Sequence, residues 1–132
     1  MILRKVRKGR CEYMSENECR LCNMLDKYAS GEEEMKIVYE SEHTLARYQT
    51  GSHKFAEVHI MILTKKHIPS LFDMTENDDE IILDVAKAIK VASEEVFALK
   101  GGCKLEMYTG KFPTFTALNH FHCHVIYDSS VD

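Results

Sequence analysis

This chain lacks the features that mark a membrane-spanning or secreted protein. No apolar stretch approaches the about 20 residues that a helix needs to cross a bilayer. The N-terminus has neither the hydrophobic run of a secretory signal nor the serine-rich character of a transit peptide. The formal net charge of −4 is too small for a strong attraction of the body of the protein to nucleic acids or membranes. We therefore expect neither as a partner, and we expect the protein in the cytoplasm, with the nucleus as a second compartment.

Internal repeats and low-complexity segments are also missing, and the length allows one ordinary domain. The chain has 132 residues, of which 45% are hydrophobic, enough for a single core. Its first ten residues hold five basic side chains and no acidic one. We predict that residues 1–14 form a flexible basic arm and that residues 15–132 form the domain. A targeting presequence and an arm that tracks nucleic acid are the alternatives for the arm.

Cysteine is present in an odd number, and two of the five cysteines are closely spaced. Cys19 and Cys22 form a Cys-x-x-Cys pair. Without a secretory signal we expect a reducing compartment, where this spacing indicates a metal site more often than a disulfide. A redox pair and two unreactive thiols are the alternatives. Cys11 is a competing ligand by sequence proximity, whereas Cys103 and Cys123 are simplest as small core residues.

Two helices are predicted from capping signals and hydrophobic spacing. Residues 15–18 have the Ser-x-x-Glu pattern of a capping box, so a short helix should begin there and end near residues 30–31. Residues 75–78 form a second capping signature. Apolar residues then recur at helical spacing over 76–99, and Gly101-Gly102 should end this long helix.

Short apolar or β-branched runs between the turn signals predict strands. The order of helix, hairpin, strand, long helix and two strands predicts an α+β domain with an antiparallel sheet, one long helix and a short N-terminal helix. The expected strands span 36–39, 45–48, 58–63, 103–108 and 118–127.

Three histidines alternate along the last predicted strand. Successive side chains of a strand point to opposite faces, so His120, His122 and His124 should share one face. Neutral imidazoles in a row suit metal ligation, proton transfer or nucleophilic attack. The first and third Cα atoms would lie about 13 Å apart, whereas zinc–nitrogen bonds are about 2.0–2.1 Å. All three therefore cannot hold one metal, and we expect a division of labour.

These histidines and two further segments resemble the histidine triad (HIT) superfamily. Residues 120–126 match the signature His-φ-His-φ-His-φ-φ, in which φ is a hydrophobic residue and Cys123 counts as apolar. Residues 59–68 resemble the family's His-x-φ-φ-φ-Pro-Lys-x-His-φ, with Thr64 at the proline position. The Cys-x-x-Cys pair is found in many members. The resemblance implies the HIT-like fold and, by family habit, a homodimer.

For function, the resemblance implies a hydrolase that acts on a purine nucleoside phosphate. His122 would attack the α-phosphorus of a phosphoramidate or dinucleoside polyphosphate, and water would hydrolyse the nucleotidyl-histidine intermediate. His124 would hydrogen-bond the phosphate or the leaving group. A backbone carbonyl, which we expect to be that of His59, would accept from the ring of His122 and set its tautomer.

The zinc-bearing members of the superfamily imply a metal site for this chain. Carried over residue by residue, the ligands are Cys19, Cys22, His67 and His120. Such a Cys₂His₂ shell has no open position, so one zinc ion per chain would be structural. His120 would then serve the metal and His122 the substrate.

Several departures from the family cluster where the nucleotide should bind. We predict that His59, Gln49, Thr116 and Ala117 contact the substrate. Gln49 replaces an acid that holds ribose hydroxyls, and Thr116-Ala117 replaces a Gln-Ser/Thr pair that holds phosphate. Arg47 either favours a more anionic ligand or is a solvated surface charge, and we expect the latter. We predict retained phosphorus chemistry with altered substrate recognition.

Three other interpretations remain open from the sequence. The altered binding positions are also consistent with a non-catalytic nucleotide-binding or scaffold protein that keeps the fold and the zinc. A metal-dependent hydrolase that uses the histidine strand catalytically would need an open coordination site. The histidines could also simply be packed or solvated.

Overall fold

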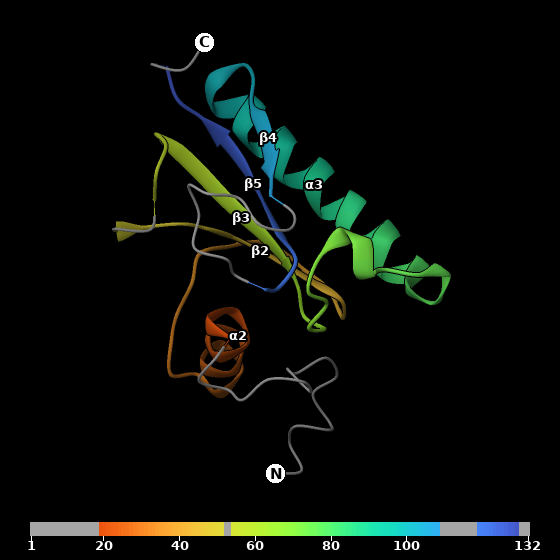
Figure 1. The fold of residues 1–132 in the computed structure, drawn as a ribbon. Helices are drawn as coiled ribbons and strands as arrows, with labels where there is room; N and C mark the ends of the chain where they lie inside the picture. Colours follow the sequence, from red (N-terminus) through yellow and green to blue (C-terminus); the bar gives the residue numbers. More distant parts are fainter. Residues whose placement is uncertain (1–18, 52–53, 109–118, 130–132) are drawn as a thin grey trace.

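The protein combines a five-stranded sheet with one helix on each face. The structure is a computed structural model that describes residues 19–51, 54–108 and 119–129 (Figure 1). Its elements in chain order are α2 (Arg20–Ser30), β1 (Ile37–Glu40), β2 (Thr44–Tyr48), β3 (Val58–Thr64), the 3-10 turns η2 (Leu71–Asp73) and η3 (Glu76–Asp78), α3 (Asp79–Lys100), β4 (Lys104–Met107) and β5 (His122–Tyr127).

The strand order is β1-β2-β3-β5-β4, and every neighbouring pair is antiparallel. This confirms the predicted α+β class with an antiparallel sheet, a long helix and a short N-terminal helix. The pairing of β3 with β5 brings together the two histidine-bearing segments of the sequence. Met61 lies opposite His124, and Leu63 lies opposite His122.

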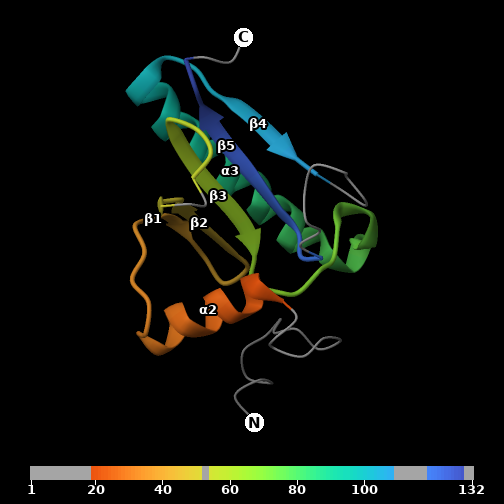
Figure 2. The ribbon, with the colours of Figure 1, turned by 60° about the vertical axis from the view of Figure 1, so that its left-hand side comes forward.

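The long helix α3 packs along one face of the sheet and forms the main core (Figures 1 and 2). Alternate residues of the central strands point toward it because side chains of a strand alternate between faces. These strand residues pack against small side chains along one side of α3, which allow the helix to approach the sheet closely. The buried members of this cluster are Ala46, Ile60, Ile62, Ala88, Ala92, Val96, Cys123 and Val125.

The short helix α2 packs on the opposite face, over β2 and β3 (Figure 2). Leu21, Cys22 and Leu25 of the helix form a second cluster with strand residues that include Met61 and Leu63. The residues of this cluster come from α2, β2 and β3, whereas the histidines of β5 lie on the same face but outside it.

Most predicted helix ends agree with the structure, but the start of α2 does not. Gly31 and Gly101 both have left-handed φ angles, of 84° and 85°, and end α2 and α3 as expected. Cys19 is extended and caps α2 through its sulfur, which accepts from the Cys22 N–H, so the predicted helix cannot run through it. Residues 15–18, where we expected the cap, lie outside the described residues. The capping box at 75–78 is confirmed, but it begins a 3-10 turn that leads into α3.

The last strand is shorter than predicted. β5 begins at His122, and His120 lies in a bend before it. The reason is that β3 ends at Thr64, so the residues before β5 have no strand to pair with. Phe121 instead donates its N–H to the carbonyl of Ile68, at 2.7 Å.

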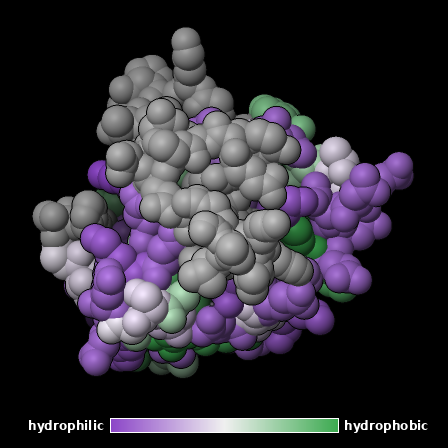
Figure 3. All heavy atoms as spheres, turned by 90° about the horizontal axis from the view of Figure 1, so that it is seen from below, coloured by the Kyte–Doolittle hydropathy of each residue, from purple (hydrophilic) through white to green (hydrophobic). Residues whose placement is uncertain are grey.

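One face of the molecule is largely polar where its residues are described. Viewed from below Figure 1, hydrophilic residues dominate the described surface, and hydrophobic residues form small patches between them (Figure 3). Within the three described ranges, no helix is both long and apolar enough to span a bilayer.

Candidate functional site

Four side chains from three separate parts of the chain converge into a buried cluster with metal-binding geometry. Cys19 and Cys22 come from the start of α2, His67 follows β3, and His120 precedes β5. One ligand atom of each lies within 4.8 Å of all the others, and all four residues are buried. His120 Nδ1 lies 3.3 Å from Cys19 Sγ and 3.2 Å from His67 Nδ1. A tetrahedron with zinc bonds of about 2.0–2.3 Å has edges of about 3.3–3.8 Å, so the cluster has the right size for zinc.

The surroundings of the cluster also suit a cation. The Nε2–H of His120 donates to the Thr64 carbonyl at 2.7 Å, which leaves the Nδ1 lone pair directed toward the other three ligand atoms. Burial raises the pKa of the Cys19 thiol and lowers the pKa of His120 to about 4. Without a cation, burial therefore favours the neutral thiol of Cys19 and the neutral ring of His120. A bound metal would instead favour the thiolate form of Cys19.

His122 lies next to this cluster, and its ring is oriented by the backbone of His120. The Nδ1–H of His122 donates to the His120 carbonyl at 2.8 Å, so Nε2 keeps a free lone pair in the neutral ring. The predicted acceptor, the carbonyl of His59, was wrong. That carbonyl accepts the N–H of Gln49 at 2.8 Å, as a ladder bond between β2 and β3 requires. The bend at His120 turns its own carbonyl toward the ring two residues later.

A chain of hydrogen bonds determines the tautomer of His124. The backbone N–H of Phe55 donates to His59 Nδ1 at 3.3 Å, so the proton of a neutral His59 lies on Nε2. His59 Nε2 is 2.8 Å from His124 Nδ1, which must then be the acceptor. The proton of His124 consequently lies on Nε2. This buried atom has no hydrogen-bond partner among the described residues.

This unpaired donor points to a ligand. A buried N–H without a partner costs about 1–3 kcal/mol, and an oxygen atom of a bound molecule would remove that cost. The rings of His122 and His124 are 5.2 Å apart between centroids and nearly perpendicular, at 89°. A free lone pair on one ring and a free N–H on the other therefore lie close together, as nucleophilic attack with stabilisation of an anionic oxygen requires.

Burial keeps these imidazoles neutral at physiological pH. It lowers the pKa of His59 to about 4 and that of His124 to about 3, and it also lowers the pKa of His122. Glu106 lies opposite His124 on β4, and its negative charge raises the pKa of His124. This effect is smaller than the lowering by burial. A neutral ring is the form that can act as a nucleophile.

The lowered pKa values of His59 and His124 predict acid-sensitive stability. Histidine has a usual pKa near 6.5, so between that pH and about 4 the unfolded chain binds protons that the folded protein does not. The contribution of these two rings to the free energy of unfolding should therefore be fully present above about pH 6.5 and should decrease as the pH falls toward 4. We expect urea unfolding at pH 5 to give a free energy about 2–3 kcal/mol lower than at pH 6.5 from these two rings.

The double variant His59→Gln/His124→Gln isolates this contribution. It retains the acid sensitivity of the rest of the protein, including the cysteine–histidine cluster, so the difference in pH slope belongs to the two rings. The substitution of the half-buried His43 by glutamine is the matched control and should leave the slope near that of the wild type. An unchanged slope in the double variant would contradict the prediction.

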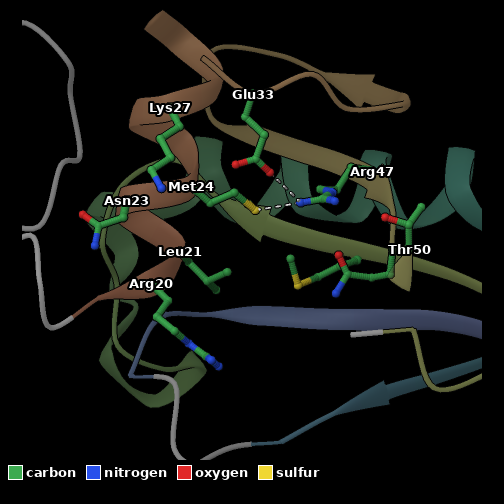
Figure 4. A pocket seen from close by; sticks show the side chains of 10 residues that line it. Arg20, Leu21, Asn23, Met24, Lys27, Glu33, Arg47 and Thr50 are labelled. Atoms are coloured by element: carbon green, nitrogen blue, oxygen red, sulfur yellow. Dashed lines mark hydrogen bonds and ion pairs between the residues drawn. The ribbon is translucent and has the colours of Figure 1, made fainter. Parts of the chain in front are cut away.

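A pocket of about 470 Å³ lies next to α2 (Figure 4), on the face of the sheet that carries the histidines. Met61 contributes to its wall, and the same residue lies directly opposite His124 in the sheet, so pocket and histidines share one face. The remaining lining comes from α2, β2 and the segments that follow them. The pocket residues are Arg20, Leu21, Asn23, Met24, Lys27, Glu33, Arg47, Gln49, Thr50 and Met61.

The structure brings most of the predicted site residues together. Gln49 lines the pocket, and the buried His59 lies 2.8 Å from His124 between ring nitrogens. Thr116 and Ala117 lie outside the described residues. Our expectation that Arg47 is a solvated charge was wrong, because its side chain is only 13% exposed and lines the pocket.

Sequence reasoning also missed Phe55, which packs on His59 with ring centroids 4.2 Å apart. Phe55 stands close to the second histidine segment, but a single aromatic residue in a loop carries no signal for such a contact. Only the tertiary structure shows that its ring and its N–H both hold His59 in place.

One protein family covers most of this chain. Residues 23–132 match the family described as "Scavenger mRNA decapping enzyme C-term binding". No curated protein matches the sequence.

Solved structures with the same fold carry histidine triad descriptions. A histidine triad protein from Clostridium difficile is 26% identical, with a TM-score of 0.65, and the match covers 90% of this chain and 97% of that protein. A HIT family hydrolase from Legionella pneumophila Philadelphia 1 is 24% identical, with a TM-score of 0.64 and coverage of 83% and 91%. A HIT family hydrolase from Clostridium thermocellum is also 24% identical, with a TM-score of 0.64 and coverage of 83% and 92%.

Proposed function

Because this chain belongs to the histidine triad superfamily, we propose that it is a nucleotide hydrolase with His122 as its nucleophile. Its substrate would be a nucleoside phosphoramidate or a dinucleoside polyphosphate, cleaved at the α-phosphate linkage. The observation that carries this proposal is the hydrogen bond from His122 Nδ1 to the His120 carbonyl, because it leaves Nε2 free to attack.

In the first step, the Nε2 lone pair of His122 forms a bond to the α-phosphorus. The bond from phosphorus to the leaving group breaks, and the leaving group departs with its electron pair. An amine takes up a proton from water, whereas a phosphate leaving group needs none. His124 donates its Nε2–H to a phosphate oxygen and keeps the proton, since loss of that proton from the neutral ring would leave an unfavourable imidazolate.

In the second step, water attacks the phosphorus of the nucleotidyl-histidine intermediate. The bond from phosphorus to Nε2 breaks and returns its electron pair to His122. The proton of the water is released to solvent, and the nucleoside monophosphate leaves. The enzyme is then in its starting form, so each turnover consumes one water molecule.

We propose that Cys19, Cys22, His67 and His120 hold one structural zinc ion. The interatomic distances of 3.2 to 3.6 Å among their ligand atoms and the hydrogen bond of His120 to Thr64 support this ligand set. Cys22 is disulfide-bonded in the structure, so zinc binding requires that this bond be reduced. Four protein ligands then leave no open position, so a bound zinc would supply no catalytic chemistry. The residues themselves would connect α2 to the segments around β3 and β5.

We also propose that the protein is a homodimer. β4 is an edge of the sheet, and its Leu105 and Met107 are exposed although they are apolar. Phe97 and Leu99 near the end of α3 are exposed as well, at 63% and 58%. Among the described residues, the outer edge of β4 pairs with no strand, and this edge together with exposed apolar side chains supports an interface between two copies of the chain.

Turnover of an adenosine phosphoramidate that carries a fluorescent amine tests the proposal. We expect equal amounts of free amine and AMP, and a covalent nucleotidyl adduct of the protein after quenching in alkaline denaturant, which preserves the acid-labile phosphorus–nitrogen bond, detected by mass spectrometry. Calorimetric binding of AMP or GMP without amine release would instead identify a non-catalytic nucleotide-binding protein. Activity that disappears on chelation while the protein stays folded would favour a metal-dependent hydrolase and contradict the proposed chemistry.

A further inference from the structure

The pocket beside the histidines is positively charged. Three of its lining residues, Arg20, Lys27 and Arg47, are cationic, and Glu33 is the anionic one. Arg20 and Lys27 extend from α2, and Arg47 extends from β2 toward the helix (Figure 4). A pocket with an excess of two positive charges favours an anionic ligand.

Arg47 is the most enclosed of these cations, and its interactions are weak. Its Nη1 contacts the sulfur of Met24 at 2.9 Å, and a thioether is a poor acceptor. Glu33 forms an ion pair with Nη1 at 3.9 Å, which is too long for a hydrogen bond, and Nε donates to the Tyr48 carbonyl at 3.2 Å. Nη2 has no hydrogen-bond partner in the part of the chain that the structure describes. The planar guanidinium thus keeps donors for a ligand, in the arrangement that suits phosphate.

Arg47 lies at a definite position relative to the histidines. It pairs with Met61, which pairs with His124, so all three point to the same face. Two strand spacings separate Arg47 from His124, which places their Cα atoms about 10 Å apart. A ligand with one phosphate at the histidines could therefore reach Arg47 with a second group.

The rest of the lining indicates which part of the ligand occupies the pocket. Met24 and Met61 offer apolar surface, and Asn23 and Gln49 offer amides that pair with hydroxyl groups or base edges. The volume of about 470 Å³ falls within the range usual for small-molecule sites. A nucleoside needs this mixture of surfaces, whereas a chain of phosphates in a leaving group would have no use for the apolar wall.

We propose that this pocket binds a second phosphate that the substrate carries on its ribose, at the 2′ or 3′ position. This inference rests on the proposed function in one respect, namely that the scissile phosphate lies at His122. It narrows the substrate class to nucleotides that are phosphorylated at both ends of the sugar. Arg47 is the residue that selects them.

Calorimetric titration of the zinc-loaded full chain tests the inference without any turnover. We expect adenosine 3′,5′-bisphosphate or its 2′,5′ isomer to bind at least about tenfold more tightly than AMP, which corresponds to about 1.4 kcal/mol. Arg47→Gln should reduce this ratio to about twofold or less and leave the affinity for AMP within about threefold. Arg47→Lys should give an intermediate ratio, because it keeps the charge but not the planar fork.

The control variant is Lys87→Gln, which removes the same charge from the exposed side of α3. It should leave the ratio unchanged. If Arg47→Gln does not fold, Arg20→Gln from the same pocket replaces it and should lower the ratio at least about threefold. Equal affinities for AMP and both bisphosphates in the wild type, or a ratio retained in the pocket variants, would overturn the inference. Tighter binding of ATP than of either bisphosphate would overturn it too.

These outcomes are separate from those of the proposed function. A protein that binds bisphosphates tightly but releases no amine would contradict the hydrolase proposal and support the pocket. A protein that hydrolyses the phosphoramidate but shows no preference for a ribose phosphate would support the hydrolase proposal and contradict the inference about the pocket.

Discussion

Substitution of His122 by alanine is expected to lower kcat/KM for the fluorescent phosphoramidate by at least about 10⁴-fold. Loss of the nucleophile removes the covalent route, and residual catalysis by the remaining groups is then all that is left. His122 lies at the edge of the buried cluster. Its substitution by alanine removes the hydrogen bond from its ring to the His120 carbonyl and leaves the cluster residues in place, so the fold should persist. Initial rates of amine release, measured with circular dichroism as a check on folding, give the result.

Two controls separate chemistry from damage to the structure. His43→Ala removes a histidine remote from the cluster, on the turn between β1 and β2, and should keep activity within about twofold of the wild type. His122→Gly should regain part of its activity when free imidazole is added, because a diffusible ring can take the vacated position. Turnover by His122→Ala within tenfold of the wild type would exclude His122 as the nucleophile.

Loss of a zinc ligand should also have a large effect, which we expect on the thermal stability of the protein and not on its catalytic rate alone. We expect Cys22→Ser to lower bound zinc from one ion per chain to nearly none. Structural zinc sites in small domains contribute apparent binding free energies of about 10–16 kcal/mol, which is comparable with the whole stability of a domain. The unfolding midpoint of Cys22→Ser should therefore fall by at least about 10–20 °C, or the variant should not fold.

Metal analysis and thermal unfolding check this prediction together. Cys103→Ser is the matched control, because Cys103 is exposed and lies outside the cluster. It should keep full zinc content and an unchanged midpoint. The wild type treated with a strong chelator should behave like Cys22→Ser. A wild type purified without zinc, or a Cys22→Ser variant with the wild-type midpoint, would contradict a structural metal site.

The class of fold could be predicted because it depends on local patterns, and the ligand set could be predicted because the segments that carry it resemble a known family. Short apolar runs between turn signals identified the strands, and Gly31 and Gly101, which have positive φ angles in the structure, marked the helix ends. The Cys-x-x-Cys pair and the two histidine segments resemble those of the zinc-bearing family members, and that resemblance implied the four residues that the structure brings within 4.8 Å of one another. Each of these signals lies within a few residues of sequence.

The errors concern interactions between distant segments. The His59 carbonyl was predicted as the acceptor for His122, but strand pairing gives that carbonyl to Gln49. Arg47 was predicted as solvated because a single charge in a strand usually faces water, and only the packing of α2 over β2 and β3 encloses it. The extended backbone of Cys19, which delays the start of α2, reflects its position in the cluster rather than its helix propensity.

The bend at His120 also limits which changes of chain length the protein can tolerate. One residue, Phe121, separates the cluster residue His120 from the first residue of β5, and its N–H is tied to Ile68. An insertion or deletion there would shift the register of β5 by one position, and a shift of one reverses the face of every side chain in a strand. His122 and His124 would then point toward α3, and Cys123 and Val125 would occupy the histidine face. Point substitutions can alter the site one group at a time, but a single inserted residue at 121 would dismantle it together with the core on the other side of the sheet.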